Sequence, residues 1–567
     1  MNHLRRWAPP LWSLGLAALL LGPALGRGYV LTYDMVWVPD LALRPDFLGL
    51  ASGLPRAVPS DAVVAVLDEV VPGMLLQKLL LLAILVGAGL GADRLVEGGS
   101  IPVRLLAIGL FQWNPFVVER LLMGHWPILI GYAVLPWTLL AARSWRAEGR
   151  LPRRLLWLVP LGSLSAGAGV VTALVVVAFA LDRFRARGVL LLVAAANAPW
   201  VSSGLLHAST SLTDASGATA FALSDEGAMP GPVTALGLGG IWNSEVVPDS
   251  RNGLVGWLAV ALVVALVCSG ARSWWRRTER RDRWGYVACW VTGWSLAVAT
   301  WVAPGAMAWL VEQVPGAGLL RDGSRWLALC APLLVVTAAR GAAVLWHQAP
   351  AHLVPRLSAA LAVVLAPIAV LPDAAWGVSS RLQAVPYPAA YATARVVVAE
   401  IEAEQPGDVL VLPASSYREP AWNAGSKVLD PVGRYLTPDF VASDVLVVSD
   451  VVIEGEDPRM QQAVSALEAA TPEARAAALG GLGFTVVVVD RQAPGRVPDV
   501  AGEQVLESPE LSVVRLPSTS SRSVPTSWAV VMGLAWVAFL GLVVAGALVT
   551  WVGRWLRRPA RADRLRP

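Results

Sequence analysis

Long apolar segments separated by polar loops recur along this sequence, and they limit its possible folds more than any other feature. A helix that crosses a membrane needs about 20 mostly apolar residues. The chain of 567 residues is 56% hydrophobic and 15% charged, whereas soluble domains carry about 25% charged residues. This composition excludes a small soluble enzyme, a disordered chain and a disulfide framework. We predict twelve membrane spans, near 9–26, 74–91, 102–113, 126–142, 155–166, 168–181, 188–206, 253–270, 286–303, 326–340, 357–372 and 527–552.

The arginines predict how these spans are oriented. With both termini inside, the inner tails and loops carry 26 arginines, and the outer loops before residue 373 carry seven. Basic residues are enriched in cytoplasmic loops. A single span over 155–181 would reverse the loops that follow, so we expect Ser165–Gly169 to divide it into two short helices. The N-terminal span also resembles a cleavable secretion signal, and both interpretations are open. The predicted location is the plasma (inner) membrane.

Two outer regions are long enough to have structure of their own. The runs 408–412 and 484–490 are typical of buried strands. Thr471-Pro472-Glu473 is typical of a helix start, with a capping hydroxyl before proline, and 388–404 is predicted as another helix. The predicted organisation begins with a transmembrane part over 1–372, whose first outer loop (27–73) is acidic. An extracytoplasmic α/β domain follows over 373–526, then a last helix over 527–552 and a basic cytoplasmic tail over 553–567.

Signatures of soluble enzymes are missing from the sequence. There is no Walker phosphate loop, nucleophile elbow, paired-cysteine zinc site or HExxH sequence. The three cysteines lie in or next to apolar runs, where a small buried hydrophobic role explains them. We therefore predict no metal ligands and no nucleic-acid partner, and the requirement for a divalent metal is left open.

The first outer loop holds the strongest candidate for a catalytic group. Asp34 lies between Tyr33 and Trp37, close to the end of the first span. A carboxylate held partly out of water becomes more basic, which suits a general base that removes a proton from a hydroxyl. The alternative is an ordinary acid in a solvated loop, and both interpretations are open for Asp34. Asp40 is the second candidate.

Further polar residues are predicted at the outer ends of the spans. Asn114-Pro115-Phe116 leads into Glu119 and Arg120, and then into Gly124-His125-Trp126. An acid, a base and an imidazole in one short loop suit a polar headgroup, although an interfacial hairpin is the alternative. Arginine binds phosphate through a planar fork. The candidate binding residues are Glu119, Arg120, His125, Arg321, Asp322, Arg325 and Lys78; for Lys78, snorkelling to the interface is the alternative.

Together these features resemble the GT-C superfamily of integral membrane glycosyltransferases. The resemblance rests on the acidic first loop, the Asn-Pro-Phe and Gly-His-Trp hairpin, the Arg-Asp-Gly-Ser-Arg-Trp run at 321–326 and the late extracytoplasmic domain. It implies an α-helical polytopic fold and a polyprenyl-phosphate-linked sugar as donor. The acceptor would be a cell-envelope glycan or lipid. The family's acidic signature maps onto Asp34, with Asp40 as second choice, although the loop lacks an adjacent pair of acids.

The resemblance implies a single displacement on the extracytoplasmic face. Asp34 would deprotonate the acceptor hydroxyl, while Arg321, Arg325 and Lys78 would stabilise the departing phosphate. Two other classes stay open: a transporter or flippase for a lipid-linked glycan, and a non-catalytic protein of envelope assembly. Transporters commonly place ionisable residues at mid-membrane depth, whereas the candidates here lie at the outer rim.

Overall fold

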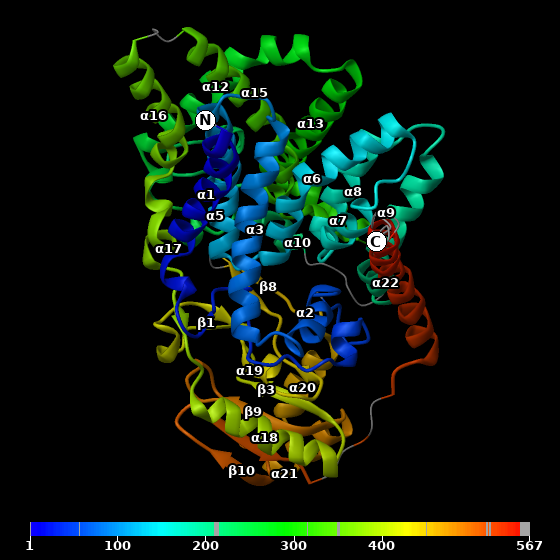
Figure 1. Cartoon of the computed structure of the whole chain (residues 1–567). Helices are drawn as coiled ribbons and strands as arrows, with labels where there is room; N and C mark the ends of the chain where they lie inside the picture. Colours follow the sequence, from blue (N-terminus) through cyan, green and yellow to red (C-terminus); the bar gives the residue numbers. More distant parts are fainter. Residues whose placement is uncertain are drawn as a thin grey trace, which may run out of the picture.

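The computed structural model describes residues 2–55, 57–208, 215–314, 316–348, 352–448, 451–517, 520 and 523–555. The predicted basic tail lies outside the described residues from residue 556 onward. Figure 1 shows a helical part above and a sheet with its own helices below, with the first outer loop between them.

The helical part contains the long apolar helices of the chain. Its main helices are α1 (Asn2–Leu21), α3 (Gly73–Leu95), α4 (Ile101–Gln112), α5 (Pro115–Leu122), α6 (Trp126–Glu148), α7 (Leu155–Leu161), α8 (Ala166–Ala180), α9 (Ala186–Leu206), α12 (Leu254–Arg277), α13 (Arg280–Val302), α14 (Pro304–Gln313), α15 (Ala331–Gln348), α16 (Leu353–Val370) and α22 (Thr526–Trp555). Shorter helices are α2 (Ser60–Asp68), α10 (Ala215–Ala220), α11 (Gly231–Leu236) and α17 (Ala375–Ser380).

The described residues contain fewer full-length candidate spans than the twelve predicted. Seven helices are long and apolar enough to cross a membrane, or up to ten if each of three bent helix pairs forms one span. Helices α4 and α5 together make one of the seven. The expected division of 155–181 into two helices is present, but the break lies earlier than predicted. Helix α7 ends at Leu161 and Ser165 caps α8, so Ala166–Gly169 form the first turn of α8 instead of the break. The seven residues of α7 rise about 10 Å, about a third of a hydrocarbon core, so α7 does not cross by itself.

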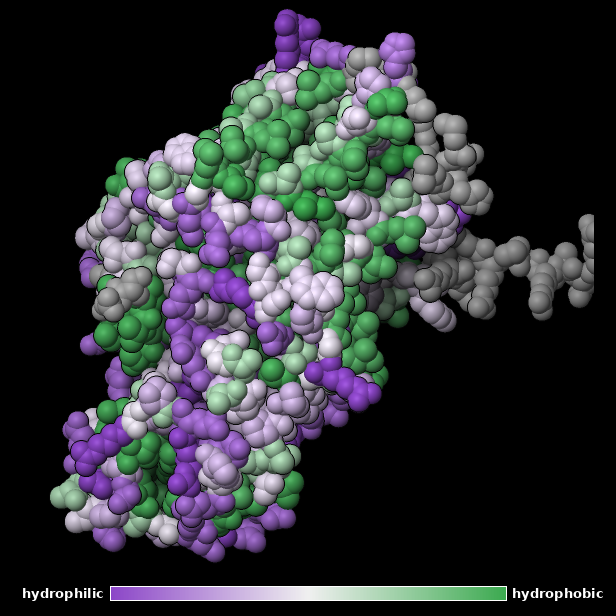
Figure 2. All heavy atoms as spheres, turned by 90° about the vertical axis from the view of Figure 1, so that its left-hand side faces the viewer, coloured by the Kyte–Doolittle hydropathy of each residue, from purple (hydrophilic) through white to green (hydrophobic). Residues whose placement is uncertain are grey.

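The surface of the helical part is strongly apolar. Leu258 of α12, Leu357 and Leu361 of α16, and Leu534 and Val537 of α22 are all exposed. Figure 2 shows hydrophobic residues gathered over the upper part of the molecule, with mostly hydrophilic residues over the lower part. Large exposed apolar surfaces mark contact with a membrane or a partner. The chain is a multi-pass membrane protein.

The lower part is built on a five-stranded mixed sheet in the order β10-β11-β9-β3-β6. Strand β3 pairs in parallel with β6 and β9, whereas β11 pairs antiparallel with β9 and β10. The predicted runs 408–412 and 484–490 are strands β3 and β9 as expected. The strands and helices of this region are β3 (Asp408–Leu412), β4 (Tyr417–Arg418), β5 (Val428–Leu429), β6 (Phe440–Val441), β7 (Leu446–Val448), β8 (Val451–Ile453), β9 (Phe484–Asp490), β10 (Glu503–Glu507), β11 (Leu511–Arg515), α18 (Ala389–Glu404), α19 (Val432–Tyr435), α20 (Pro458–Leu467) and α21 (Pro472–Gly481).

The sheet is covered on both faces. Alternate residues of a strand point to opposite faces, so Val409 and Val411 join the same core as Val398 of α18. Leu410 and Leu412 join the core formed with α20 and α21. Burial on both faces explains why these strands are continuous apolar runs. Thr471 caps α21 by accepting a hydrogen bond from the amide of Ala474, as its sequence pattern predicts.

The first outer loop docks onto this lower part. Strand β1 (Tyr29–Val30) pairs with β2 (Ala384–Val385). The guanidinium of Arg44 donates to the carbonyls of Gly433 and Pro438, at 2.9 and 2.6 Å. Asp61 forms an ion pair with Arg434. The loop is therefore the layer that joins the helical part to the sheet.

Candidate active site

Asp34 lies in a tight turn between two parts of the molecule. The amide of Asp34 donates to the carbonyl of Met123 at 3.1 Å, just after α5. The hydroxyl of Thr32 donates to the carbonyl of Leu122 at 2.7 Å. Gly124 has a φ of +74°, and a Cβ atom there would lie 2.2 Å from the amide nitrogen of Met35. Only glycine leaves room for the turn to approach the end of α5 this closely.

The two carboxylate oxygens of Asp34 contact different donors. The hydroxyl of Tyr417 donates to Oδ1 at 2.6 Å. Nε2 of His125 lies 3.0 Å from Oδ2. The side chain of Asp34 is 41% exposed, so the carboxylate also faces solvent. It is therefore both held in place and accessible to a reactant.

The neighbours of His125 determine its protonation. Nη1 of Arg120 lies 2.8 Å from Nδ1 of His125. Because a guanidinium only donates, Nδ1 accepts and the ring proton is on Nε2, where it is donated to Asp34. Burial lowers the pKa of His125, the hydrogen bond with Asp34 opposes this, and the charge of Arg120 adds to the lowering. His125 is therefore a neutral donor to Asp34.

Arg120 is fixed by Asp322 in a buried pair. Its Nη1 and Nη2 atoms donate to Oδ2 and Oδ1 of Asp322 at 2.7 and 2.8 Å. Nη2 also donates to the hydroxyl of Ser324 at 2.6 Å. Burial alone would raise the pKa of Asp322, but the charges of Arg120 and Arg325 hold it well below its usual range. A two-pronged pair of this kind is specific in geometry as well as strong.

Arg325 extends the same network toward the start of α8. Its Nη2 atom lies 3.3 Å from Oδ2 of Asp322, and it interacts electrostatically with Asp34. Its Nε atom is buried without a hydrogen-bond partner among the described residues. A Cβ atom at Gly167, in the first turn of α8, would lie 2.5 Å from Cδ of Arg325. Arg325 thus lies against a helix N-terminus, where the positive end of the helix dipole favours an anion.

Five predicted residues are brought together in this way, and four are placed elsewhere. Asp34, Arg120, His125, Asp322 and Arg325 form one connected cluster, which we call the Asp34 cluster. Asp40 instead pairs with Arg395 of α18 at 2.6 Å. Arg321 lies over the ring of Phe221 and 3.8 Å from Glu456.

The remaining two predicted residues are buried in the helical part. Nζ of Lys78 is buried and has no hydrogen-bond partner among the described residues. Glu119 lies against Glu226 and near Arg251. The contacts that join the Asp34 cluster involve neither Lys78 nor Glu119.

Several residues around Asp34 were not among the predicted site residues. Tyr33 donates a hydrogen bond to Glu245, and Nζ of Lys427 lies 2.9 Å from Oε2 of Glu245. The hydrogen bond from Tyr33, followed by the charge of Lys427, lowers the pKa of Glu245. Tyr417 is 383 residues from Asp34 in the chain. No local pattern around Tyr417 or Lys427 connects either residue to the first loop.

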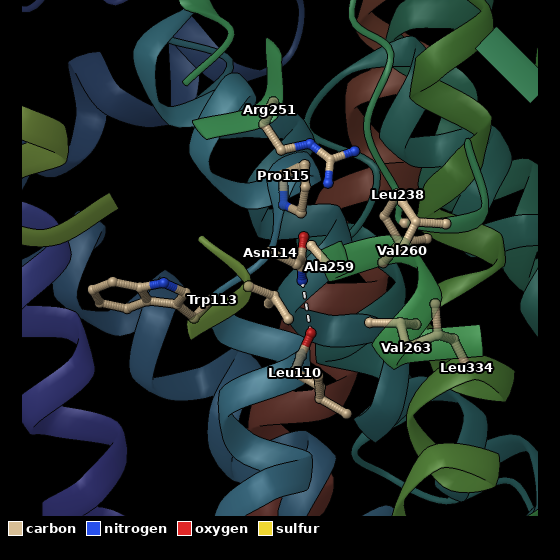
Figure 3. Close-up of a pocket in the computed structure, with 12 residues that line it drawn as sticks. Leu110, Trp113, Asn114, Pro115, Leu238, Arg251, Ala259, Val260, Val263 and Leu334 are labelled. Carbon is tan, nitrogen blue, oxygen red and sulfur yellow. Dashed lines mark hydrogen bonds between the residues drawn. The ribbon is translucent and has the colours of Figure 1, made fainter. Parts of the chain in front are cut away.

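A cavity beside Asn114 is not a second candidate for a sugar site. It is lined by Trp113, Asn114, Pro115, Arg251 and apolar residues of α12 and α15, and its volume is about 20 Å³. Figure 3 shows Arg251 at one end, with Val260, Val263 and Leu334 along one side. This volume holds about one water molecule. Among the residues that the structure describes, no group of three or more His, Cys, Asp or Glu side chains is placed to hold a metal ion.

Comparisons with known proteins find similarity at the level of the fold. No family model and no curated protein matches the sequence. A cryo-EM structure of the arabinofuranosyltransferase AftD from Mycobacteria matches with a TM-score of 0.53 and 16% sequence identity, covering 92% of this chain and 40% of that chain. A mutant of AftD matches with a TM-score of 0.53 and 15% identity, covering 91% of this chain and 42% of that chain.

AftD belongs to the GT-C superfamily. The resemblance that the sequence motifs indicated is therefore confirmed for the fold. The chain spans about two fifths of the length of the AftD structures that it matches.

Proposed function

We propose that this chain is a membrane glycosyltransferase that moves a sugar from a polyprenyl-phosphate donor to a cell-envelope glycan or lipid on the extracytoplasmic face. One observation carries the proposal. An accessible carboxylate, Asp34, is connected through His125, Arg120 and Asp322 to Arg325, in a chain with a GT-C-like fold. A base and a phosphate-binding arginine therefore lie in one cluster.

Asp34 would act as the general base. Its carboxylate accepts the proton of the acceptor hydroxyl while the hydroxyl oxygen attacks the anomeric carbon. The bond between that carbon and the phosphate oxygen breaks, and the lipid phosphate leaves with the bonding electrons. Since Nδ1 of His125 is occupied by Arg120, His125 does not take up the proton. The proton stays on Asp34 until it passes to solvent through the exposed side of the carboxylate.

Arg325 would bind the donor phosphate. A guanidinium matches the geometry of phosphate oxygens, and the Nε atom of Arg325 has no hydrogen-bond partner among the described residues. Nucleotide sugars stay in the cytosol, so a transferase that acts outside needs a donor carried by a lipid. Asp322 orients both Arg325 and Arg120. Arg321 and Lys78 lie outside the Asp34 cluster, so Arg325 alone would bind the phosphate.

The test is an assay of the purified protein with labelled polyprenyl-phosphate sugars and envelope acceptors. Wild type should form product, and Asp34→Asn should reduce the rate by about 10²–10⁴-fold, which is the usual contribution of a general base. Asp40→Asn is the matched control, because Asp40 lies in the same loop but pairs with Arg395, and it should keep most of the activity.

Other outcomes of this assay distinguish the alternatives. Movement of the labelled lipid across a vesicle membrane without product would identify a flippase. Neither product nor movement would indicate a non-catalytic protein of envelope assembly. Full activity of Asp34→Asn alongside an active wild type would remove Asp34 from the mechanism.

A further inference from the structure

The hairpin that carries Tyr417 is anchored rigidly in the lower part of the molecule. Arg418, next to Tyr417 in β4, is buried and donates to Asp430 at 2.7 Å and to the carbonyl of Pro413 at 3.0 Å. Its Nε atom lies 3.3 Å from Oδ2 of Asp490, the last residue of β9. A buried arginine with two buried carboxylates is costly to disturb. The backbone at Tyr417 is therefore held in place by the core of the sheet.

The same hairpin also holds the turn that contains Asp34. The amide of Tyr33 donates to the carbonyl of Lys427 at 2.7 Å, and the amide of Leu429 donates to the carbonyl of Tyr33 at 2.8 Å. Tyr33 has a φ of +43°, a conformation that bulky residues rarely adopt. These two main-chain hydrogen bonds keep Tyr33 in that conformation, and they aim the side chain of the next residue, Asp34, between His125 and Tyr417.

The contacts of the Asp34 carboxylate define its plane. Tyr417 donates to Oδ1 at 2.6 Å, which is the short length typical of a hydroxyl bound to a charged carboxylate. His125 contacts the other oxygen, Oδ2. The last torsion of an aspartate is broad when nothing restrains it, so one donor on each oxygen is needed to fix the carboxylate. Each oxygen has two lone pairs, so both oxygens can still accept a proton.

We infer that Tyr417 is a positioning residue for Asp34, so that the C-terminal α/β region completes the active site of the helical part. This inference rests on the proposed function. His125 holds the carboxylate from the side of the membrane helices, and Tyr417 holds it from the side of the sheet. The α/β region then acts on the reaction itself, besides any part it takes in binding an acceptor.

The variant Tyr417→Phe tests this inference. It keeps the ring and its edge contact with Tyr33, whose centroid is 5.9 Å away, and removes only the hydroxyl. The turnover number kcat should fall about 10- to 100-fold, the effect of losing one hydrogen bond to a charged group, while KM for donor and acceptor stays near the wild-type value. In an Asp34→Asn background the same substitution should have no further effect on the residual rate. The matched control is Tyr435→Phe, in α19 of the same region, which should leave kcat unchanged.

Several outcomes would overturn the inference while leaving the proposed function intact. In an active enzyme that depends on Asp34, an unchanged kcat in Tyr417→Phe would show that the hydroxyl does not position the base. A raised KM with an unchanged kcat would make Tyr417 a substrate contact instead. If Tyr417→Phe lowered the transfer rate by the same factor in wild type and in Asp34→Asn, Tyr417 would act independently of Asp34. If wild type transfers no sugar and Asp34→Asn makes no difference, the proposed function fails and this inference fails with it.

Discussion

Two clusters of carboxylates and arginines begin at neighbouring residues of α5. Arg120 belongs to the Asp34 cluster, which ends at a carboxylate that is 41% exposed. Glu119 faces Glu226 and Arg251, whose side chains are 0% and 2% exposed. The first cluster therefore reaches a surface where a substrate can approach, whereas the second is closed on all sides.

The closed cluster has a structural explanation. Nε of Arg251 donates to Oε2 of Glu226 at 2.6 Å, and the amide of Gly240 donates to Oε1 of Glu226 at 2.5 Å. These contacts tie Gly240 and Arg251, which lie on either side of Glu245 in the sequence, to Glu226, and Glu226 lies against Glu119 of α5. Two neighbouring residues of one helix therefore have different surroundings: Arg120 belongs to a cluster that ends at an exposed carboxylate, and Glu119 lies against an enclosed ion pair.

The largest expected effect is on stability, from breaking the closed cluster. Arg251→Met would leave the buried carboxylate of Glu226 without its ion-pair partner, and should lower the free energy of unfolding by about 3–5 kcal/mol. Thermal unfolding in lipid nanodiscs measures this loss. The double variant Glu226→Gln with Arg251→Met should recover much of it, because the buried charge of Glu226 is then removed. If Arg251→Met unfolded at the same temperature as wild type, the closed cluster would not contribute to the stability of the fold.

A smaller effect, on rate rather than stability, is expected from Arg325. Arg325→Met should lower the rate of sugar transfer by about 100-fold, as for the loss of one group that stabilises developing charge. The unfolding midpoint should fall less than in Arg251→Met, because Asp322 loses its contact with Arg325 but keeps its two hydrogen bonds from Arg120. Arg321→Met is the control and should keep its activity, since Arg321 lies against Phe221. If the transfer rate fell equally in Arg325→Met and Arg321→Met, the assignment of phosphate binding to Arg325 and not to Arg321 would be wrong.

The smallest expected effect is a dependence of stability on pH. Burial holds the pKa of His125 below its ordinary value of 6.5, so below pH 6.5 the unfolded chain binds a proton that the folded chain excludes. Stability from this group is therefore complete above pH 6.5 and falls as the pH drops toward the folded-state pKa. The unfolding midpoint of His125→Gln should fall less over this range than that of wild type. His347→Gln, an exposed histidine of α15, should behave as wild type, and identical pH profiles for His125→Gln and wild type would contradict the burial argument.

Much of the architecture was predictable because it depends on local patterns. Apolar length identified the long helices, and the two apolar runs identified β3 and β9. The small residues at 165–169 indicated that 155–181 is divided, although the break between α7 and α8 lies just before them. The described residues hold seven to ten candidate spans where the sequence predicts twelve, because short helices such as α7 and bent pairs such as α13 with α14 have the composition of a span without its straight length. Hydropathy reports which residues avoid water and is insensitive to a bend.

The candidate site was predictable only in part. The residue types and their location at the outer ends of the helices predicted Asp34, His125 and Arg325 as site residues. The same criteria also selected Asp40 and Lys78, which the structure places outside the Asp34 cluster. A charged residue in a loop has many possible partners, and its neighbours in sequence do not decide among them.

Local sequence patterns are enough to show that this chain enters a membrane as many helices and carries polar groups at their ends, because hydrophobic length and helix caps act over a few residues at a time. Which of those polar groups meet depends on how distant segments pack in three dimensions. Asp34, His125 and Tyr417 come from three distant segments, and a hydrogen bond needs its two atoms within about 3 Å. That proximity depends on how α5, the first outer loop and the β4–β5 hairpin pack together, and no short stretch of sequence contains that information.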